Sequence, residues 1–98
     1  MNEKWPTSSE LTKAFLFSLN ELGGIGSVAD LDTITIKRIN LSPELIAIKR
    51  LGTRGEIQYR LAWVRTKAKQ NGLVTREVDK NWKITEKGRD FLSSNKIE

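Results

Sequence analysis

The sequence lacks cysteine and histidine altogether, and its 98 residues include only two prolines. Without cysteine the chain has no disulfide and no thiolate metal site, and without histidine it has neither a histidine-containing zinc site nor a Ser-His-Asp triad. Its apolar runs are too short to span a membrane, and its first ten residues lack the apolar core of a secretory signal. We therefore expect a cytoplasmic chain of one domain, residues 1–98, without a metal or a cofactor.

The acidic residues do not form a recognisable catalytic set. A metal-dependent cleavage centre needs clustered acidic ligands, whereas the 12 Asp and Glu residues are scattered along the chain. Asp30 and Asp32 are two positions apart, so on a helix they point to different faces. Glu77 and Asp79 fall in a turn segment. We expect no catalytic residues and no enzyme activity in this chain.

The net positive charge is confined to the second half of the chain. Residues 1–51 contain six Lys or Arg and six Asp or Glu, whereas residues 52–98 contain eleven and six, so the whole net charge of +5 lies in the second half. A basic half beside a neutral half indicates contact with a polyanion. A solvated surface that keeps the protein soluble is the equal alternative on charge alone.

The first helix signal begins near Ser8 or Ser9, either of which can be the N-cap, and ends at Gly23 and Gly24. Its apolar residues recur at helical spacing. They are Leu11, Phe15, Leu19 and Leu22.

Two shorter helix signals follow. Ser27 with Asp30 resembles a capping box and favours a helix over 28–39, although the β-branched run "TITIKRI" favours a strand. We predict helix there. Ser42 as a cap and Pro43 at the first helical position predict another short helix.

A basic helix, a hairpin and a last helix complete the chain. The helix is expected over about residues 55–71 and ends at Asn71 and Gly72. Two β-type runs then form a hairpin, or wing, over about 73–85, and a helix follows over about 86–94. The order predicts a mainly α fold with a small β-hairpin, arranged as a winged helix-turn-helix. In that plan the helix before the hairpin enters the DNA major groove.

The basic helix has an apolar stripe on one side and a polar face on the other. At about 100° per residue, the stripe contains Ile57, Leu61, Val64 and Ala68. The opposite side holds Gln58, Tyr59, Ala62, Thr66, Lys69 and Gln70. Ala62 can contact a thymine methyl group, and Gln58 can pair with an adenine edge. Arg65 lies on one flank, and Arg60 and Lys67 lie on the other, where we expect phosphate contacts.

Cations outside the helix extend this surface. Arg54 can contact a phosphate or a guanine, with an ordinary loop arginine as a nearly equal alternative. Arg76, Lys80 and Lys83 suit a wing that follows phosphates. The predicted DNA-binding residues are Arg54, Gln58, Tyr59, Arg60, Ala62, Trp63, Arg65, Thr66, Lys67, Lys69, Arg76, Lys80 and Lys83.

The three tryptophans receive separate interpretations. Trp63 lies beside the apolar stripe, and we expect it to cover the core against the wing, with base stacking as the alternative. Trp82 alternates with Ile84 and is expected in the core. Trp5 precedes the first helix and is expected to cap it.

The stretch "YRLAWVRTKAKQNGLV…NWKITEKGRDFL" resembles the N-terminal winged-helix domain of Mrr-type restriction endonucleases. The resemblance covers roughly residues 54–92, and the first 50 residues match in pattern only. Two positions depart mildly, with Val64 where alanine is common and Lys83 where arginine is common. The matching positions are Arg60, Trp63, Arg65, Gly72, Leu73, Trp82, Lys83, Ile84, Thr85, Gly88 and Arg89.

This resemblance implies a non-catalytic module that binds double-stranded DNA and accompanies a nuclease domain, in the same or another chain, in defence against foreign DNA. It also implies reading of modified bases such as N6-methyladenine, for which Ala62 and Tyr59 are suitable residues. The chain is then either a stand-alone binder or an excised N-terminal domain. A protein-interaction or dimerisation winged helix and a small transcription repressor are the alternative functions.

Overall fold

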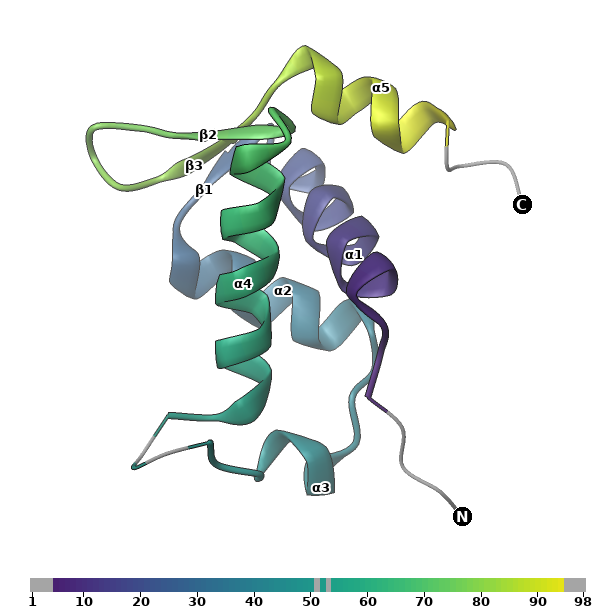
Figure 1. Ribbon diagram of the computed structural model, residues 1–98, viewed down its shortest axis with the longest axis vertical. Coiled ribbons are helices and arrows are strands. Elements are labelled where there is room, and N and C mark those ends of the chain that lie inside the picture. Colours follow the sequence, from purple (N-terminus) through teal and green to yellow (C-terminus); the bar gives the residue numbers. More distant parts are fainter. Residues whose placement is uncertain (1–4, 51, 53, 95–98) are drawn as a thin grey trace.

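Helices dominate the structure, a computed structural model that describes residues 5–50, 52 and 54–94. Within these residues it contains five helices and one three-stranded antiparallel sheet (Figure 1). In chain order the elements are α1 (Ser8–Glu21), β1 (Ile25–Gly26), α2 (Val28–Arg38), α3 (Pro43–Ile46), α4 (Glu56–Gln70), β2 (Val74–Arg76), β3 (Trp82–Ile84) and α5 (Glu86–Ser94).

The helix α1 begins one residue earlier than expected from Ser8 or Ser9 as N-cap. Thr7 is the N-cap: its hydroxyl accepts a hydrogen bond from the Glu10 N–H at 3.1 Å, and the Glu10 carboxylate accepts one from the Thr7 N–H at 2.8 Å. This reciprocal capping box satisfies two helix-terminal donors at once, which a cap at Ser8 or Ser9 lacks. At the other end the prediction is confirmed, because Gly23 and Gly24 take φ values of 92° and 95°.

The residues of α2 form a helix, although the sequence of this segment contains both helix and strand signals. Ser27 caps it, accepting a hydrogen bond from the Asp30 N–H at 3.2 Å, and α2 ends at Arg38, within one residue of the expected end. Leu31 and Thr35 are buried one helical turn apart. Tertiary packing of this face therefore overrides the β propensity of the branched residues.

The sheet contains the predicted hairpin and one strand that the sequence did not reveal. β2 and β3 pair antiparallel with Val74 opposite Ile84, as expected for a wing. The two-residue strand β1 adds to the other edge of β3, with Ile25 opposite Lys83 and Gly26 opposite Trp82. A strand of two residues has no alternation pattern to detect. The element order is compatible with a winged helix.

One core joins the helices to the sheet. The buried faces of α1 and α4 meet in its centre, where Phe15, Leu19, Ile57 and Leu61 are almost fully inaccessible to solvent. Trp82 is buried in the same cluster, as expected from its alternation with Ile84. Figure 1 shows α4 crossing in front of α2, with the wing at one end of α4 and α3 near the other.

The helix α5 packs closely through Gly88 on Leu73, directly before β2, and on Ile84 of β3. A methyl group added to Gly88 would lie 2.3 Å from the Leu73 carbonyl oxygen and 2.7 Å from the Ile84 side chain. Thr85 caps this helix by accepting a hydrogen bond from the Gly88 N–H at 3.0 Å, and it donates one to the Gly72 carbonyl at 2.7 Å. Thr85 therefore links the start of α5 to the base of the wing by hydrogen bonds.

We expect Gly88→Ala to destabilise the fold, although alanine normally favours a helix over glycine. Overpacking against a backbone carbonyl should reduce the free energy of unfolding by about 1–3 kcal/mol. Urea unfolding followed by circular dichroism measures this. Ser93→Ala, at an exposed position of the same helix, is the matched control and should change stability by about 0.5 kcal/mol or less. Equal stability of the two variants would contradict the close packing.

Candidate nucleic-acid interface

The helix α4 presents one buried and one exposed side, as the periodicity predicted. Ile57, Leu61, Val64 and Ala68 are all buried in the core. On the opposite side a shallow hollow of about 330 Å³ lies along the helix surface. Its lining residues are Arg54, Tyr59, Ala62, Trp63 and Thr66. The structure thus brings five of the predicted site residues together on one surface, which we call the α4 face.

Two arginines that precede α4 lie near the Tyr59 ring. The Arg50 guanidinium lies 3.9 Å from the centre of the Tyr59 ring, and the Arg54 guanidinium lies 5.8 Å from it. Both distances suit cation–π attraction. Arg50 was not among the residues predicted from the sequence, although basic residues alternate with glycines in "KRLGTRG" directly before α4.

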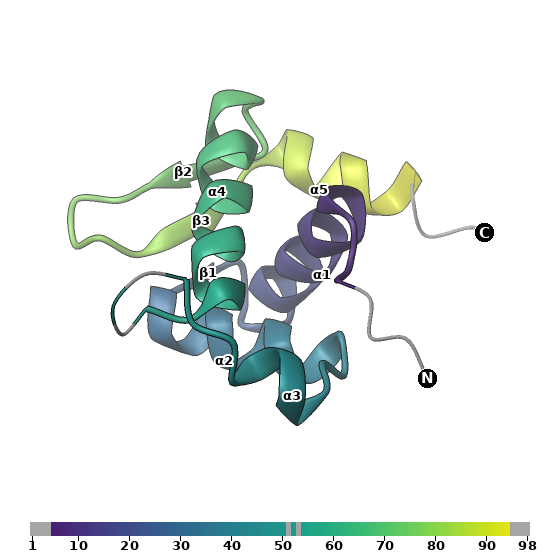
Figure 2. The same cartoon turned by 60° about the horizontal axis from the view of Figure 1, so that its bottom comes forward.

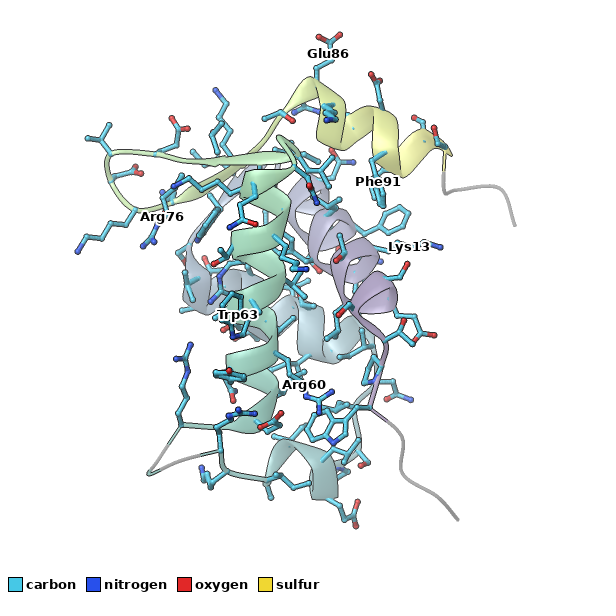
Figure 3. All side chains as sticks on the ribbon, viewed as in Figure 1. Lys13, Arg60, Trp63, Arg76, Glu86 and Phe91 are labelled. Atoms are coloured by element: carbon cyan, nitrogen blue, oxygen red, sulfur yellow. The ribbon has the colours of Figure 1, made fainter. Side chains whose placement is uncertain are left out.

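Trp63 differs from the expectation that it covers the core. Its side chain is 53% exposed and borders the hollow, and Figure 3 shows it on the outer side of α4. Trp82 and not Trp63 provides the buried indole at the base of the wing. A large exposed aromatic side chain on a polar helix face is typical of a binding surface.

Arg65 is a correction to the predicted phosphate contacts. Its side chain is only 8% exposed and donates a hydrogen bond to the Asp32 carboxylate of α2 at 2.6 Å. Burial raises the pKa of the Asp32 carboxyl, while the neighbouring Arg65 guanidinium acts in the opposite direction. Arg65 therefore forms an ion pair that links α4 to α2. Unlike the other cations of α4, it does not face solvent.

Arg60 lies on the flank of α4 that faces the N-terminal segment, away from Trp63 (Figure 3). Its Nε donates a hydrogen bond to Glu56 at 2.8 Å, and its guanidinium lies 4.4 Å from the centre of the Trp5 ring. Trp5 is therefore a packing partner of α4, whereas Thr7 and not Trp5 caps α1. Arg60 has two intramolecular partners and is separate from the α4 face.

Glu56, the first residue of α4, connects two arginines. Besides Arg60 it accepts a hydrogen bond from Arg50 at 3.4 Å, and its side chain is 13% exposed. The hydrogen bond from Arg60, with a further contribution from Arg50, lowers the pKa of the Glu56 carboxyl. An ionised carboxylate at this position also interacts favourably with the helix N-terminus.

Two polar side chains of α4 lie against the backbone of their own helix or its N-cap. The Gln58 amide folds back toward the N-cap, where its Oε1 would lie 2.0 Å from a Cβ built on Gly55. Gly55 leaves room for this amide because it has no side chain. The Thr66 hydroxyl donates to the Ala62 carbonyl at 3.1 Å. The Gln58 side chain must therefore move away from Gly55 before it can reach a partner in the hollow.

The wing carries exposed cations around a turn. Arg76, Lys80 and Lys83 are all exposed. The Arg76 guanidinium lies 5.1 Å from the Trp82 ring, and its Nε donates to the Lys80 carbonyl at 3.3 Å. Val78 at the tip is fully exposed. The three predicted wing cations thus lie in one hairpin, which begins four residues after α4 ends.

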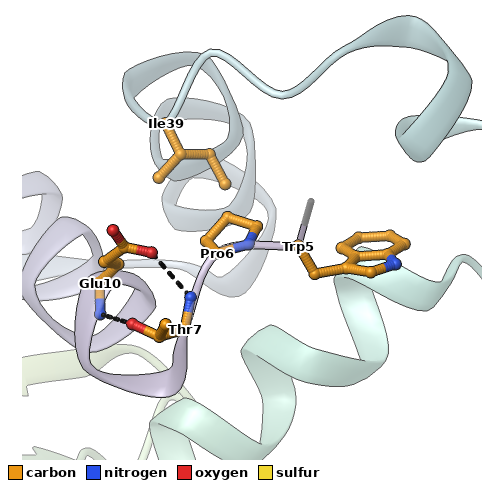
Figure 4. A pocket seen from close by; sticks show the side chains of 5 residues that line it. All are labelled: Trp5, Pro6, Thr7, Glu10 and Ile39. Atoms are coloured by element: carbon orange, nitrogen blue, oxygen red, sulfur yellow. Dashed lines mark hydrogen bonds between the residues drawn. The ribbon is translucent and has the colours of Figure 1, made fainter. Parts of the chain in front are cut away.

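A larger hollow of about 530 Å³ lies on another part of the surface, between the start of α1 and the end of α2 (Figure 4). It is lined by Trp5, Pro6, Thr7, Glu10 and Ile39. Among the described residues that line it, Glu10 is the only acidic one, and it is committed to the capping box. In the part of the chain that the structure describes, no three potential metal ligands come together, and no helix is long and apolar enough to cross a membrane.

Comparison with known proteins identifies one family. The family model described as the Mrr N-terminal domain matches residues 9–94. The match includes α1 and α2, which resembled the family in pattern only when the sequence was considered alone. No curated protein and no solved structure matches the chain.

We expect Asp32→Ala to be strongly destabilising because it leaves the Arg65 guanidinium buried without its counter-ion. The free energy of unfolding should fall by about 3–5 kcal/mol, and the double variant Asp32→Ala with Arg65→Met should recover most of the loss. Chemical unfolding measures both. Asp30→Ala, at an exposed position of the same helix, is the control. If Asp32→Ala lost no more stability than Asp30→Ala, the result would contradict a structural role of the ion pair.

The lowered pKa of Glu56 predicts a pH-dependent contribution to stability. This contribution is present above the ordinary carboxyl pKa of about 4.5 and is lost as the pH falls through the lower folded-state pKa. The melting temperature of Glu56→Gln should therefore lie below that of the parent at pH 7, and the gap should close below about pH 4.5. Glu86→Gln changes the first residue of α5 and controls for the helix-terminal charge. A gap that is independent of pH would contradict the role of the ionised carboxylate.

Proposed function

The chain belongs to the Mrr N-terminal domain family, and on this premise we propose that it is a winged-helix module that binds double-stranded DNA. The family is an N-terminal domain associated with the Mrr restriction system and is not itself the nuclease domain. In our proposal α4 is the recognition helix and the β2–β3 hairpin is the wing. A nuclease domain in the same or another chain performs the cleavage.

The α4 face is the single observation that carries this proposal. It combines two accessible aromatic side chains, Tyr59 and Trp63, with the small residue Ala62 beside them. Cations border it at both ends, and Glu56 is the only acidic residue of α4. An α-helix fits the major groove of B-DNA, where a small residue lets the helix approach base edges closely. A helix face bordered by cations suits a polyanionic duplex better than an apolar protein partner.

In this arrangement the centre of the α4 face contacts bases. Ala62 forms a small apolar position that can accept a thymine methyl group. Tyr59 and Trp63 lie beside it and add apolar ring surface. The methyl group of N6-methyladenine or 5-methylcytosine also projects into the major groove and would meet the same surface. We therefore propose that the hollow discriminates methylated from unmodified bases.

Cations around the face contact phosphates. Arg54 precedes α4, Lys67 and Lys69 lie on its exposed surface, and the wing adds three more. The proposed phosphate contacts are Arg54, Lys67, Lys69, Arg76, Lys80 and Lys83. With six contacts, the logarithm of the association constant should fall with the logarithm of salt concentration with a slope of about −5. Arg65 is excluded because it is buried, and Arg60 is excluded because it is bound to Glu56 and Trp5.

A protein-interaction module is the alternative, and the exposed apolar residues argue against it. The large exposed apolar side chains of the described residues are dispersed over β1, the region of α3, α4 and the wing tip. They are Ile25, Ile46, Ile48, Trp63 and Val78. An interaction surface normally gathers such residues into one patch. A repressor would in addition need a dimer to read a two-fold site.

The proposal is tested by fluorescence-anisotropy titration of matched duplexes that are unmodified or carry N6-methyladenine or 5-methylcytosine. We expect salt-sensitive binding, and preference for a methylated duplex would support methyl reading by the hollow. No binding to any duplex at low salt would overturn the proposal and favour protein interaction.

Two variants separate the proposed roles. Ala62→Glu places a charge and bulk at the centre of the α4 face and should abolish preference among duplexes, with a loss of affinity of at least about tenfold. Lys83→Ala on the wing should weaken binding to all duplexes equally and reduce the magnitude of the salt slope by about one. The same titrations measure both effects. Equal effects of the two variants on discrimination would contradict the proposed orientation of α4.

A further inference from the structure

We infer that Lys49, Arg50 and Arg54, which precede α4, bind DNA phosphates at the opposite end of α4 from the wing, with Arg50 as the main contact. We call these three residues the basic arm. The inference rests on the proposed DNA binding and adds to it a phosphate-binding element with two residues, Lys49 and Arg50, outside the predicted site. It does not depend on which base the α4 face reads.

Backbone hydrogen bonds fix the base of the arm to α4. The Arg50 N–H donates to the Arg54 carbonyl at 2.8 Å, and the Glu56 N–H donates to the Ile48 carbonyl at 2.9 Å. Lys49 and Gly55 form an antiparallel bridge between these bonds. The arm therefore has the pairing of a short hairpin that leads into the first turn of α4. This pairing holds the backbones of Lys49, Arg50 and Arg54 close together despite their like charge.

Arg50 is oriented by two contacts that leave part of its guanidinium accessible. Its guanidinium carbon lies over the Tyr59 ring, 3.9 Å from the ring centre, and one of its terminal nitrogens, Nη1, donates to Glu56 at 3.4 Å. The side chain nevertheless remains 43% exposed. Because a guanidinium has five N–H donors in one plane, stacking on a ring leaves its edge able to donate to a phosphate.

The charge of the arm is only partly balanced. Glu56 is the acidic partner of Arg50, and it makes its shorter hydrogen bond, 2.8 Å, to Arg60. One shared carboxylate thus serves Arg50 and Arg60, while Lys49 and Arg54 add two further charges nearby. Asp32, which interacts with Arg54, is paired with the buried Arg65. A phosphate at the arm would relieve the repulsion among these cations.

The position of the arm complements that of the wing. A helix of 15 residues is about 22 Å long at about 1.5 Å per residue. The arm enters one end of α4 and the wing leaves the other, and both lie on the same side of α4 in two views (Figures 1 and 2). A helix of this length that lies along the major groove would place the arm and the wing at phosphates separated along the duplex.

The inference is tested by measuring duplex affinity at several salt concentrations for Arg50→Ala, Arg50→Lys and the control Arg38→Ala. Arg38 is an exposed arginine that bonds Glu21 and lies over Phe17, apart from the α4 face. For Arg50→Ala we expect about tenfold weaker binding and a salt slope smaller in magnitude by about one. Arg50→Lys should keep the slope, because it keeps the charge. Arg38→Ala should resemble the parent.

Ethylation interference locates the contact. Arg50→Ala should lose interference at phosphates on one side of the site, and Lys83→Ala should lose it on the other. Thermal unfolding of each variant provides the folding control, and we expect Arg50→Ala to melt like the parent. Weaker binding with an unchanged slope would show that Arg50 acts only by positioning Tyr59 and would overturn the inference.

The possible failures can be told apart. If the parent binds duplexes and Arg50→Ala binds as Arg38→Ala does, the arm is wrong while the proposed function stands. If the parent binds no duplex at low salt, the proposed function fails, and the basic arm fails with it.

Discussion

The rest of the site depends on the orientation of α4 about its long axis, that is, on which side of the helix faces the core. Burial of Ile57, Leu61, Val64 and Ala68 in the core turns Tyr59, Ala62 and Trp63 outward. The Arg65–Asp32 pair disfavours other orientations of α4, because turning the helix would leave a buried guanidinium without its counter-ion. A hydrophobic stripe alone tolerates some rotation, whereas a hydrogen-bonded ion pair specifies one arrangement.

Much of this architecture was predictable because helix periodicity and capping are local properties. The bounds of α4, the wing and α5 agree with the expected ranges to within about one residue, and the Thr7 cap could have been found from its three-residue spacing to Glu10. The strand β1 was not predictable, since two residues carry no period and Ile25 pairs with Lys83 from the far end of the chain.

The candidate site was predictable to the same extent. A helical wheel separates the buried from the exposed side of α4, but it does not show which neighbour covers each flank. Arg65 meets Asp32 across 33 positions of sequence, and Arg60 meets Trp5 across an even longer separation. These pairings depend on where α2 and the N-terminal segment pack. Cations that look alike in sequence therefore divide into structural residues and surface residues only in three dimensions.

The stacking of Arg50 on Tyr59 also bears on the entropy of association. A long side chain that is immobilised by a partner loses rotational freedom, at a cost of about 0.5–1.5 kcal/mol. In this protein the ring of Tyr59 restricts Arg50 before any ligand arrives, whereas the exposed lysines of the wing must be ordered during complex formation. The two ends of α4 would thus differ in preorganisation. The preordered Arg50 side chain would be suited to setting the register of an encounter, and the wing lysines would be suited to adapting to the shape of the partner.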